Sequence, residues 1–203
     1  MEKLARLRLA RAAAALNRAV NCKLPSLVLM MDDERLPDPL SAARALPRGS
    51  MVVVRARQSA HRAKLARSLQ AIAREHRLTL LIANDPALAD RIAAAGLHLS
   101  EANARGAAEW RARRPHWLIT TAAHSLAACT RARQWGADAA FLAPVFATAS
   151  HPNEAGLGPT RARVLAGMAP LPVYALGGVT AQNAARLGHS AFAGIAAIGA
   201  RAA

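Results

Sequence analysis

The sequence predicts an α/β protein built as a single (β/α)8 barrel, with an N-terminal helix and a truncated eighth outer helix. The first observation behind this prediction is that eight short apolar runs alternate with segments of helical periodicity, as in parallel strands covered by helices. The second is that polar residues or glycines follow most of the runs, where the chemistry of such barrels lies. The runs span residues 27–31, 51–54, 78–83, 96–99, 117–122, 139–143, 173–176 and 194–198.

An open, doubly wound sheet is the alternative arrangement for this alternation of strands and helices. Its dinucleotide-binding form carries G-x-G-x-x-G where the first helix opens. That motif is missing from the start of the first helix here. A length of 203 residues suits one domain and lies near the lower limit of a (β/α)8 barrel. We therefore expect one barrel domain over residues 1–203.

The N-terminal helix, expected within residues 1–24, is basic and amphipathic. Its apolar residues recur at helical spacing from Ala5 to Val20, and Pro25 ends the pattern. The same composition fits a transit peptide or a helix that binds a charged surface, so these alternatives stay open. Only a few residues follow the last strand, which makes the N-terminal helix a candidate to cover the place of an eighth outer helix.

The remaining helices connect consecutive strands. Pro86 suits the first turn of its helix, whereas Ser125 and Thr180 suit the N-cap position. The helix after the second strand is expected to bury Leu69 and to leave Arg62 on its solvent side. The expected spans are 39–46, about 65–73, 86–95, 100–114, 125–135, 160–168 and 180–187.

Composition narrows the class of protein. The chain is 53% hydrophobic and only 3% aromatic, and its formal net charge of +15 comes almost entirely from arginine. A basic surface attracts nucleic acid or anionic membranes, but aromatic residues for base stacking are scarce and no nucleic-acid-binding motif occurs. Cys22 and Cys129 are too few for a disulfide framework, and no apolar run approaches the ~18 residues of a membrane span. We expect a cytoplasmic protein with no specific nucleic-acid partner.

Polar side chains and glycines gather where the predicted strands end, so barrel closure would bring them to one mouth. Glycines after the last two strands let backbone N–H groups approach a phosphate, aided by a helix N-terminus. The alternative is that Gly177 and Gly178 only turn the chain. The residues at the strand ends are Asp32, Asp33, Arg55, Arg57, Ser59, Asn84, Asp85, His98, Ser100, Thr121, His124, Thr148, Ser150, His151, Gly177, Gly178 and Gly199.

Three of these side chains allow a more specific interpretation. Arg57 can hold a carboxylate or phosphate through two parallel hydrogen bonds, or it can be a solvated surface residue. His124 can exchange protons, because the unperturbed pKa of an imidazole is about 6.5, or it can merely close the start of a helix. His98 lies within a strand, and we expect it to be packed.

Several short motifs occur in order along this framework, and together they are specific. They are Val54-Arg55-Ala56-Arg57, Asn84-Asp85, Gly96-Leu97-His98-Leu99, His124-Ser125-Leu126, Gly136-Ala137-Asp138, Pro144-Val145-Phe146 with Thr148, and Ala175-Leu176-Gly177-Gly178. From Leu27 to Gly199 the chain thereby resembles the thiamine phosphate synthase/TenI family of TIM barrels.

The synthase branch of this family joins a pyrimidine pyrophosphate to a thiazole phosphate, with Mg²⁺ on the leaving group. Its pattern has Gln-x-Arg-x-Lys after the second strand, where this chain has Arg55, Arg57 and Ser59. It has a metal-binding aspartate near the place of Asn103 and a lysine where His151 stands. This chain therefore lacks two lysines that neutralise pyrophosphate and one carboxylate ligand of a hard cation.

The TenI branch is more similar to this chain, and its members act as thiazole tautomerases. They aromatise a thiazole phosphate carboxylate by proton transfer. Their Arg-x-Arg-x-Ser after the second strand and their histidine before Ser-Leu after the fifth both occur here. The resemblance thus implies that His124 is the acid/base catalyst and that no cofactor is required.

The resemblance also implies a binding site for a phosphorylated thiazole and, because such barrels often pair, a homodimer. Mg²⁺, with Asp85 among its ligands, belongs only to the synthase alternative, and a non-catalytic ligand-sensing barrel is a further alternative. The implied substrate-binding residues are Arg55, Arg57, Asn84, Thr148, Ser150 and His151, and the implied phosphate-binding residues are Gly177, Gly178 and Gly199.

Overall fold

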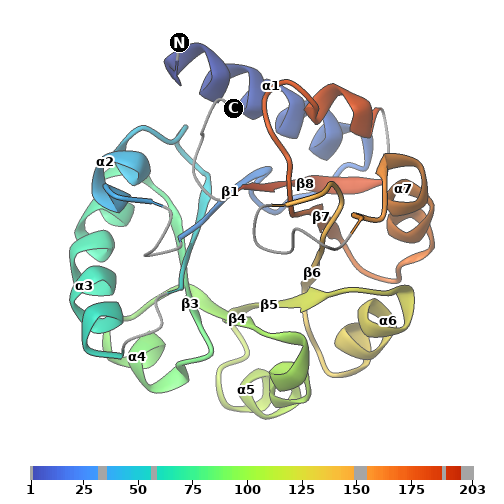
Figure 1. Ribbon diagram of the computed structural model, residues 1–203. Coiled ribbons are helices and arrows are strands. Elements are labelled where there is room, and N and C mark those ends of the chain that lie inside the picture. Colours follow the sequence, from blue (N-terminus) through green and yellow to red (C-terminus); the bar gives the residue numbers. More distant parts are fainter. Residues whose placement is uncertain (1, 32–35, 56–58, 149–154, 189–190, 198–203) are drawn as a thin grey trace.

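The computed structural model is a closed barrel of eight parallel strands (Figure 1). It describes residues 2–31, 36–55, 59–148, 155–188 and 191–197. Each strand pairs in parallel with the next, and β8 pairs with β1 to close the ring. The predicted (β/α)8 barrel is therefore confirmed. The strands are β1 (Leu27–Met30), β2 (Met51–Val54), β3 (Thr79–Ala83), β4 (Gly96–Leu99), β5 (Leu118–Ala123), β6 (Ala139–Leu142), β7 (Val173–Ala175) and β8 (Phe192–Ala197).

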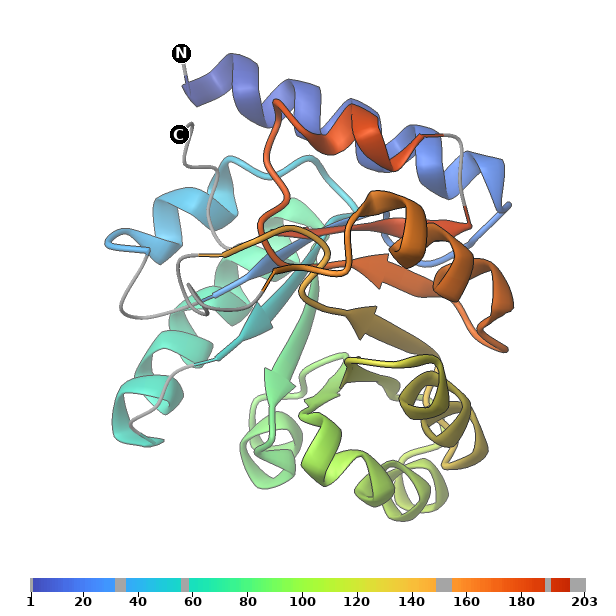
Figure 2. The same cartoon turned by 45° about the vertical axis from the view of Figure 1, so that its right-hand side comes forward.

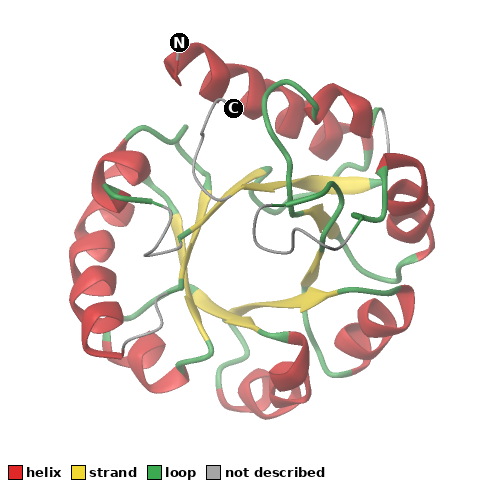
Figure 3. Cartoon of the chain, in the orientation of Figure 1, coloured by secondary structure: helices red, strands yellow, loops and turns green. Residues whose placement is uncertain are grey.

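Helices surround the ring of strands, as Figures 2 and 3 show from two directions. In the described residues, none of these helices has the length and apolar character that crossing a membrane requires. The α-helices are α1 (Glu2–Ala19), α2 (Pro39–Arg44), α3 (Ser59–His76), α4 (Pro86–Arg91), α5 (Ala107–Arg113), α6 (Leu126–Gln134) and α7 (Pro159–Met168), and the 3-10 helices are η1 (Glu101–Gly106) and η2 (Ala184–Leu187).

Alternate residues of each strand point to opposite sides of the barrel wall. Met30, Phe141 and Tyr174 belong to the cluster that fills the interior. Leu29, which precedes Met30 in the sequence, faces outward instead and packs with residues of the surrounding helices, such as Leu69. The barrel is therefore a packed core, and ligands can reach it only at its ends.

The helix α1 lies against the outer side of β8 (Figure 1). Its apolar face buries Leu9, Ala13 and Leu16. The Asn17 side chain donates hydrogen bonds from Nδ2 to the carbonyls of Leu24 and Ala193, at 3.0 and 2.7 Å. As the sequence suggested, α1 covers the strand that an eighth outer helix would otherwise cover, and within the described residues no helix follows β8.

The expected helix over residues 180–187 is wrong in extent, because only the 3-10 turn η2 forms there. Thr180 and Asn183 open this segment, because their side chains bond each other's backbone in the reciprocal arrangement of a capping box. The N–H of Thr180 donates to Asn183 Oδ1 at 2.8 Å, and the N–H of Asn183 donates to Thr180 Oγ1 at 3.3 Å. This arrangement starts a helical turn, and the N–H of Ala184 also donates to the carbonyl of Thr180 at 2.9 Å, so the start of the predicted helix is present although only a 3-10 turn follows.

The last strand also begins two residues before its predicted start. The sequence analysis placed the start of the strand at Gly194, but this glycine lies inside β8. A Cβ at this position would lie 2.0 Å from the carbonyl oxygen of Ser26. The glycine therefore serves a close approach of two backbones, which is its usual role inside a strand.

Candidate functional site

The loops after β6 and β7 lie side by side at the C-terminal mouth of the barrel. The N–H of Val145 donates to the carbonyl of Leu176 at 2.9 Å, and the N–H of Phe146 donates to the carbonyl of Gly177 at 3.0 Å. These bonds continue the pairing of the two strands beyond their ends. The two loops can therefore contribute to one ligand site, as the sequence predicted.

Gly177 and Gly178 lie in the loop after β7. Both have positive φ angles, 90° and 64°. A Cβ on Gly177 would lie 2.8 Å from Cα of Pro144, and one on Gly178 would lie 2.4 Å from the carbonyl oxygen of Ala147. Glycine is thus required by packing alone, which is the structural alternative considered above. Phosphate binding by these two residues stays a prediction.

Thr148 ends the described part of the first loop, beside these glycines. Its Cγ2 atom lies 3.4 Å from the Cβ position of Gly177. Its Oγ1 atom is buried and has no hydrogen-bond partner among the described residues. Because a buried hydroxyl normally has a partner, this oxygen is available to a ligand that enters between the loops.

Asn84 links the ends of β3 and β4. Its φ is positive, at 50°, and its Oδ1 atom accepts the N–H of Ser100 at 2.9 Å and an Nδ2 hydrogen of Asn103 at 3.2 Å. Asn84 therefore lies at the mouth, but the described residues already occupy its acceptor.

Asp85 acts as the N-cap of α4. Its Oδ1 atom accepts the N–H of Leu88 at 3.0 Å, and its Oδ2 atom lies 3.6 Å from Nη1 of Arg62. The second metal-ligand position of the synthase pattern is the neutral amide of Asn103, and within the described residues no group of three or more His, Cys, Asp or Glu side chains could hold a metal ion. Because Mg²⁺ is usually held by one or two carboxylates together with substrate phosphates, Asp85 stays the metal ligand expected under the synthase alternative.

Arg62 does not lie on the solvent side of its helix as expected. Only 16% of its side chain is exposed. It extends from the first turn of α3 to the end of β3, where Nη1 donates to the carbonyl of Ala83 at 3.4 Å. Its Nε atom is buried, and no described residue forms a hydrogen bond with it. The sequence analysis missed this cation because helical periodicity does not account for the reach of a long side chain in a first turn.

His98 is packed inside the barrel, as predicted. Its Nδ1 atom lies 2.9 Å from Thr120 Oγ1, and its ring lies 4.8 Å from that of Phe141. Burial, with a smaller contribution from the nearby positive charge of Arg55, lowers the pKa of His98 to about 3.

His124 follows β5 and pairs with Glu101, the first residue of η1. The Nδ1 atom of His124 lies 2.7 Å from Glu101 Oε2, and the same oxygen accepts the backbone N–H of His124 at 2.9 Å. The His124 side chain is 59% exposed and that of Glu101 is 31% exposed. An imidazole held through one nitrogen and open to solvent elsewhere can exchange a proton with a ligand at the mouth.

The sequence analysis missed Glu101. Two facts could have identified it: Glu101 lies two residues beyond β4, and His124 directly follows β5. Because neighbouring parallel strands end at the same edge of a sheet, a carboxylate and an imidazole at these positions are expected to meet.

Six of the residues predicted at the strand ends lie outside the described part of the chain. They are Asp32, Asp33, Arg57, Ser150, His151 and Gly199. Their roles stay predictions. The described residues that the barrel brings to its mouth are Arg55, Asn84, Asp85, Thr148, Gly177, Gly178 and His124, joined by Glu101 and Arg62.

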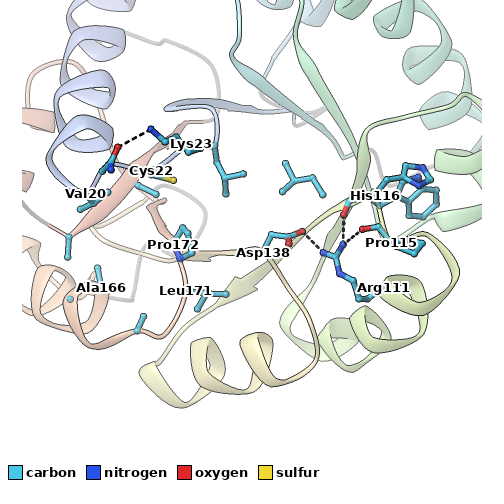
Figure 4. Close-up of a pocket in the computed structure, with 18 residues that line it drawn as sticks. Val20, Cys22, Lys23, Arg111, Pro115, His116, Asp138, Ala166, Leu171 and Pro172 are labelled. Atoms are coloured by element: carbon cyan, nitrogen blue, oxygen red, sulfur yellow. Dashed lines mark hydrogen bonds and ion pairs between the residues drawn. The ribbon is translucent and has the colours of Figure 1, made fainter.

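A cavity of about 810 Å³ lies at the opposite end of the barrel, where the strands begin (Figure 4). Its lining includes Lys23, His116, Pro172 and the ion pair of Arg111 with Asp138. The Arg111 guanidinium is occupied by the carboxylate and by backbone carbonyls. We place the candidate functional site at the C-terminal ends of the strands, because the exposed His124 and the paired loop ends lie there. The N-terminal ends of the strands, where this cavity lies, serve stability in such barrels.

The comparisons with known proteins agree with the fold. A sequence profile of the thiamine monophosphate synthase (TMP-TENI) family matches residues 27–200. The chain is 31% identical over 170 residues to the thiamine-phosphate synthase of Marinobacter nauticus, a match that covers 79% of this chain and 75% of that protein. With the thiamine phosphate pyrophosphorylase of Pyrococcus furiosus it shares a TM-score of 0.72 at 21% identity, over 90% of this chain and 88% of that one.

A relative from Aquifex aeolicus is 33% identical over 117 residues. That match covers 58% of this chain and 62% of the relative, which is less than two thirds of its length. The family profile, in contrast, extends from the first strand to beyond the last. By this match the chain belongs to the thiamine monophosphate synthase family.

Proposed function

We propose that this protein acts in thiamine biosynthesis as a thiazole tautomerase of the TenI type. The observation that carries the proposal is the pairing of the exposed His124 with Glu101 at the mouth of the barrel. A tautomerase needs a group that takes a proton from one atom of the substrate ring and returns one at another. An oriented imidazole meets that need without a metal ion.

In this proposal the substrate is a thiazole that carries a phosphate and a carboxylate. Its phosphate would bind to the backbone N–H groups of Gly177 and Gly178, and Thr148 Oγ1 would add a hydrogen bond. The carboxylate would bind to Arg57, with the positive charge of Arg55 nearby. The Nε2 atom of His124 would then transfer the proton, so that the product has the atoms of the substrate in a new tautomer.

Synthesis of thiamine phosphate is the second candidate. The names of the Marinobacter nauticus and Pyrococcus furiosus relatives favour it, and Asn84 and Asp85 stand at the end of β3 as in the synthase pattern. Against it, Asp85 already caps a helix and the position of Asn103 carries no charge. The donor set for a pyrophosphate-bound Mg²⁺ is thus weaker than this reaction needs.

The two candidates are separated by assaying both reactions with and without EDTA. We expect tautomerisation that persists in EDTA and thiamine phosphate formation near background. His124→Ala should lower the tautomerase kcat about 10²- to 10⁴-fold, the usual contribution of an acid/base group. The matched control His116→Ala removes an exposed histidine at the other end of the barrel and should leave kcat unchanged.

Each other outcome has a definite meaning. Mg²⁺-dependent thiamine phosphate formation without tautomerisation would replace the proposal by the synthase candidate. Binding of the phosphorylated thiazole without either turnover would indicate a ligand-sensing barrel. A His124→Ala enzyme that retains the wild-type rate would remove His124 from the mechanism.

A further inference from the structure

We infer that Glu101 is a positioning residue that fixes both the orientation and the tautomer of the His124 imidazole. The catalytic part of this inference rests on the proposed function, because it concerns how His124 would transfer its proton. The structural part concerns the two side chains alone and can be tested without turnover.

The geometry restricts His124 at two points. One oxygen of Glu101, Oε2, accepts both the backbone N–H of His124 at 2.9 Å and its ring Nδ1 at 2.7 Å. An oxygen shared between the backbone and the ring of one residue fixes the direction of the side chain relative to its own main chain. The ring is otherwise 59% exposed, so this contact provides the constraint that packing would provide in a core.

The carboxylate itself is held from a second side. Its other oxygen, Oε1, lies 3.5 Å from Nη2 of Arg131 on α6. Glu101 begins η1, whereas His124 precedes α6, so the carboxylate connects the ends of β4 and β5 with the helix that follows. A group restrained in this way loses less conformational freedom on pairing with His124 than a free surface carboxylate would.

The chemistry of the contact determines which ring nitrogen is available. A carboxylate only accepts hydrogen bonds, so Nδ1 must carry a hydrogen to donate to Oε2. In the neutral imidazole the lone pair then lies on Nε2, directed away from Glu101. Nε2 is therefore the atom that accepts a proton from a ligand and later returns it, and an unpaired histidine would spend part of its time in the inactive tautomer.

NMR of the histidine ring nitrogens tests this inference directly. Long-range ¹H–¹⁵N spectra of wild type should show His124, assigned with the His124→Gln variant, as the Nδ1–H tautomer at a pH where the ring is neutral. In Glu101→Leu, which removes the acceptor, the Nε2–H form favoured by free imidazole should dominate. The control Glu109→Leu removes an exposed carboxylate of α5 that pairs with Arg113 and should leave the His124 signals unchanged.

The kinetic arm separates positioning from folding. Glu101→Gln keeps the size of the side chain but also offers a donor, so it no longer dictates the tautomer. It should lower the tautomerase kcat about 10-fold, a fraction of the loss caused by His124→Ala, and change KM less than twofold. Circular dichroism should show an intact barrel.

The results that overturn the inference are distinct from those that overturn the proposed function. Retention of the Nδ1–H tautomer in Glu101→Leu would show that Glu101 does not set it. A changed tautomer with wild-type kcat in Glu101→Gln would show that the tautomer does not matter for turnover. Absence of turnover in wild type would reject the tautomerase, while the NMR spectra would still decide whether Glu101 orients His124.

Discussion

Nη2 of Arg111 lies 2.5 Å from Oδ2 of Asp138 (Figure 4), and the same carboxylate oxygen accepts the N–H of Ile119 at 2.7 Å. Arg111 also donates from Nη1 to the carbonyls of Pro115 and Trp117, at 2.6 and 3.0 Å. One guanidinium thus connects α5, β5 and the start of β6 at the base of the barrel.

Replacement of Arg111 by methionine should lower the free energy of unfolding by about 2–3 kcal/mol, because Asp138 and several half-buried carbonyls lose their donor. Urea unfolding followed by circular dichroism measures this change. Arg113→Met is the matched control, because Arg113 is 61% exposed and pairs with Glu109 on the surface of the same helix. It should cost less than about 1 kcal/mol, and equal losses in both variants would contradict the assigned role of Arg111.

Stability should fall in acid because His98 is buried in its neutral form. Its pKa is about 3 in the folded protein and about 6.5 in the unfolded chain, so unfolding takes up a proton at any pH between these values. The contribution of the neutral His98 to the free energy of unfolding is complete above pH 6.5 and is lost as the pH falls. Between pH 7.5 and 5, wild type should lose about 2 kcal/mol more than His98→Gln. If the free energies of unfolding of wild type and His98→Gln fell equally with pH, His98 would not be the cause of the acid sensitivity.

Alanine at position 178 should weaken binding of a phosphorylated ligand. The φ of 64° disfavours any side chain, and the new Cβ would meet the carbonyl of Ala147 at 2.4 Å. The displaced loop should raise KM about 10-fold or more, which corresponds to about 1.4 kcal/mol. Gly106→Ala is the control, since a Cβ there meets nothing within 4 Å; if both variants raise KM equally, the loop after β7 does not bind the ligand.

Substitution of Asp85 distinguishes a helix cap from a metal ligand. Asp85→Asn keeps an oxygen for the N–H of Leu88 and should retain tautomerase turnover, whereas Asp85→Ala should lose about 1 kcal/mol of stability. Asp38 caps α2 in the same way, through the N–H of Ser41 at 3.0 Å, so Asp38→Ala should also destabilise the protein. Loss of turnover in Asp85→Asn, restored by excess Mg²⁺, would instead indicate a metal site.

The barrel could be predicted because each apolar run is short, continuous and bounded by polar residues or glycine. The strand from Met51 to Val54 is predicted to the residue. The segment after Gly178 was harder to predict, because Thr180 and Asn183 bond each other as at a helix start, yet only the 3-10 turn η2 follows. Apolar periodicity over so few residues does not determine whether a segment forms an α-helix or a 3-10 turn.

The site could be predicted in part. Strand order places His124 and the glycines at one mouth without any knowledge of side-chain contacts. Glu101 and Arg62 belong to the site only because their side chains extend to neighbouring strand ends, where Glu101 contacts His124 and Arg62 contacts the carbonyl of Ala83. That information depends on the register between strands, such as the pairing of Leu99 with Thr121, which local sequence patterns do not contain.

The contact between α1 and β8 joins two segments that are far apart in the sequence, so that α1 is synthesised well before β8. Asn17 reaches the carbonyl of Ala193 across 176 positions of sequence, and β1 has no neighbour on one side until β8 arrives. Such distant pairings make folding slow. During translation, the apolar face of α1 and the open edge of β1 must therefore stay exposed until β8 has left the ribosome, and exposed apolar surfaces and unpaired strand edges of this kind favour aggregation.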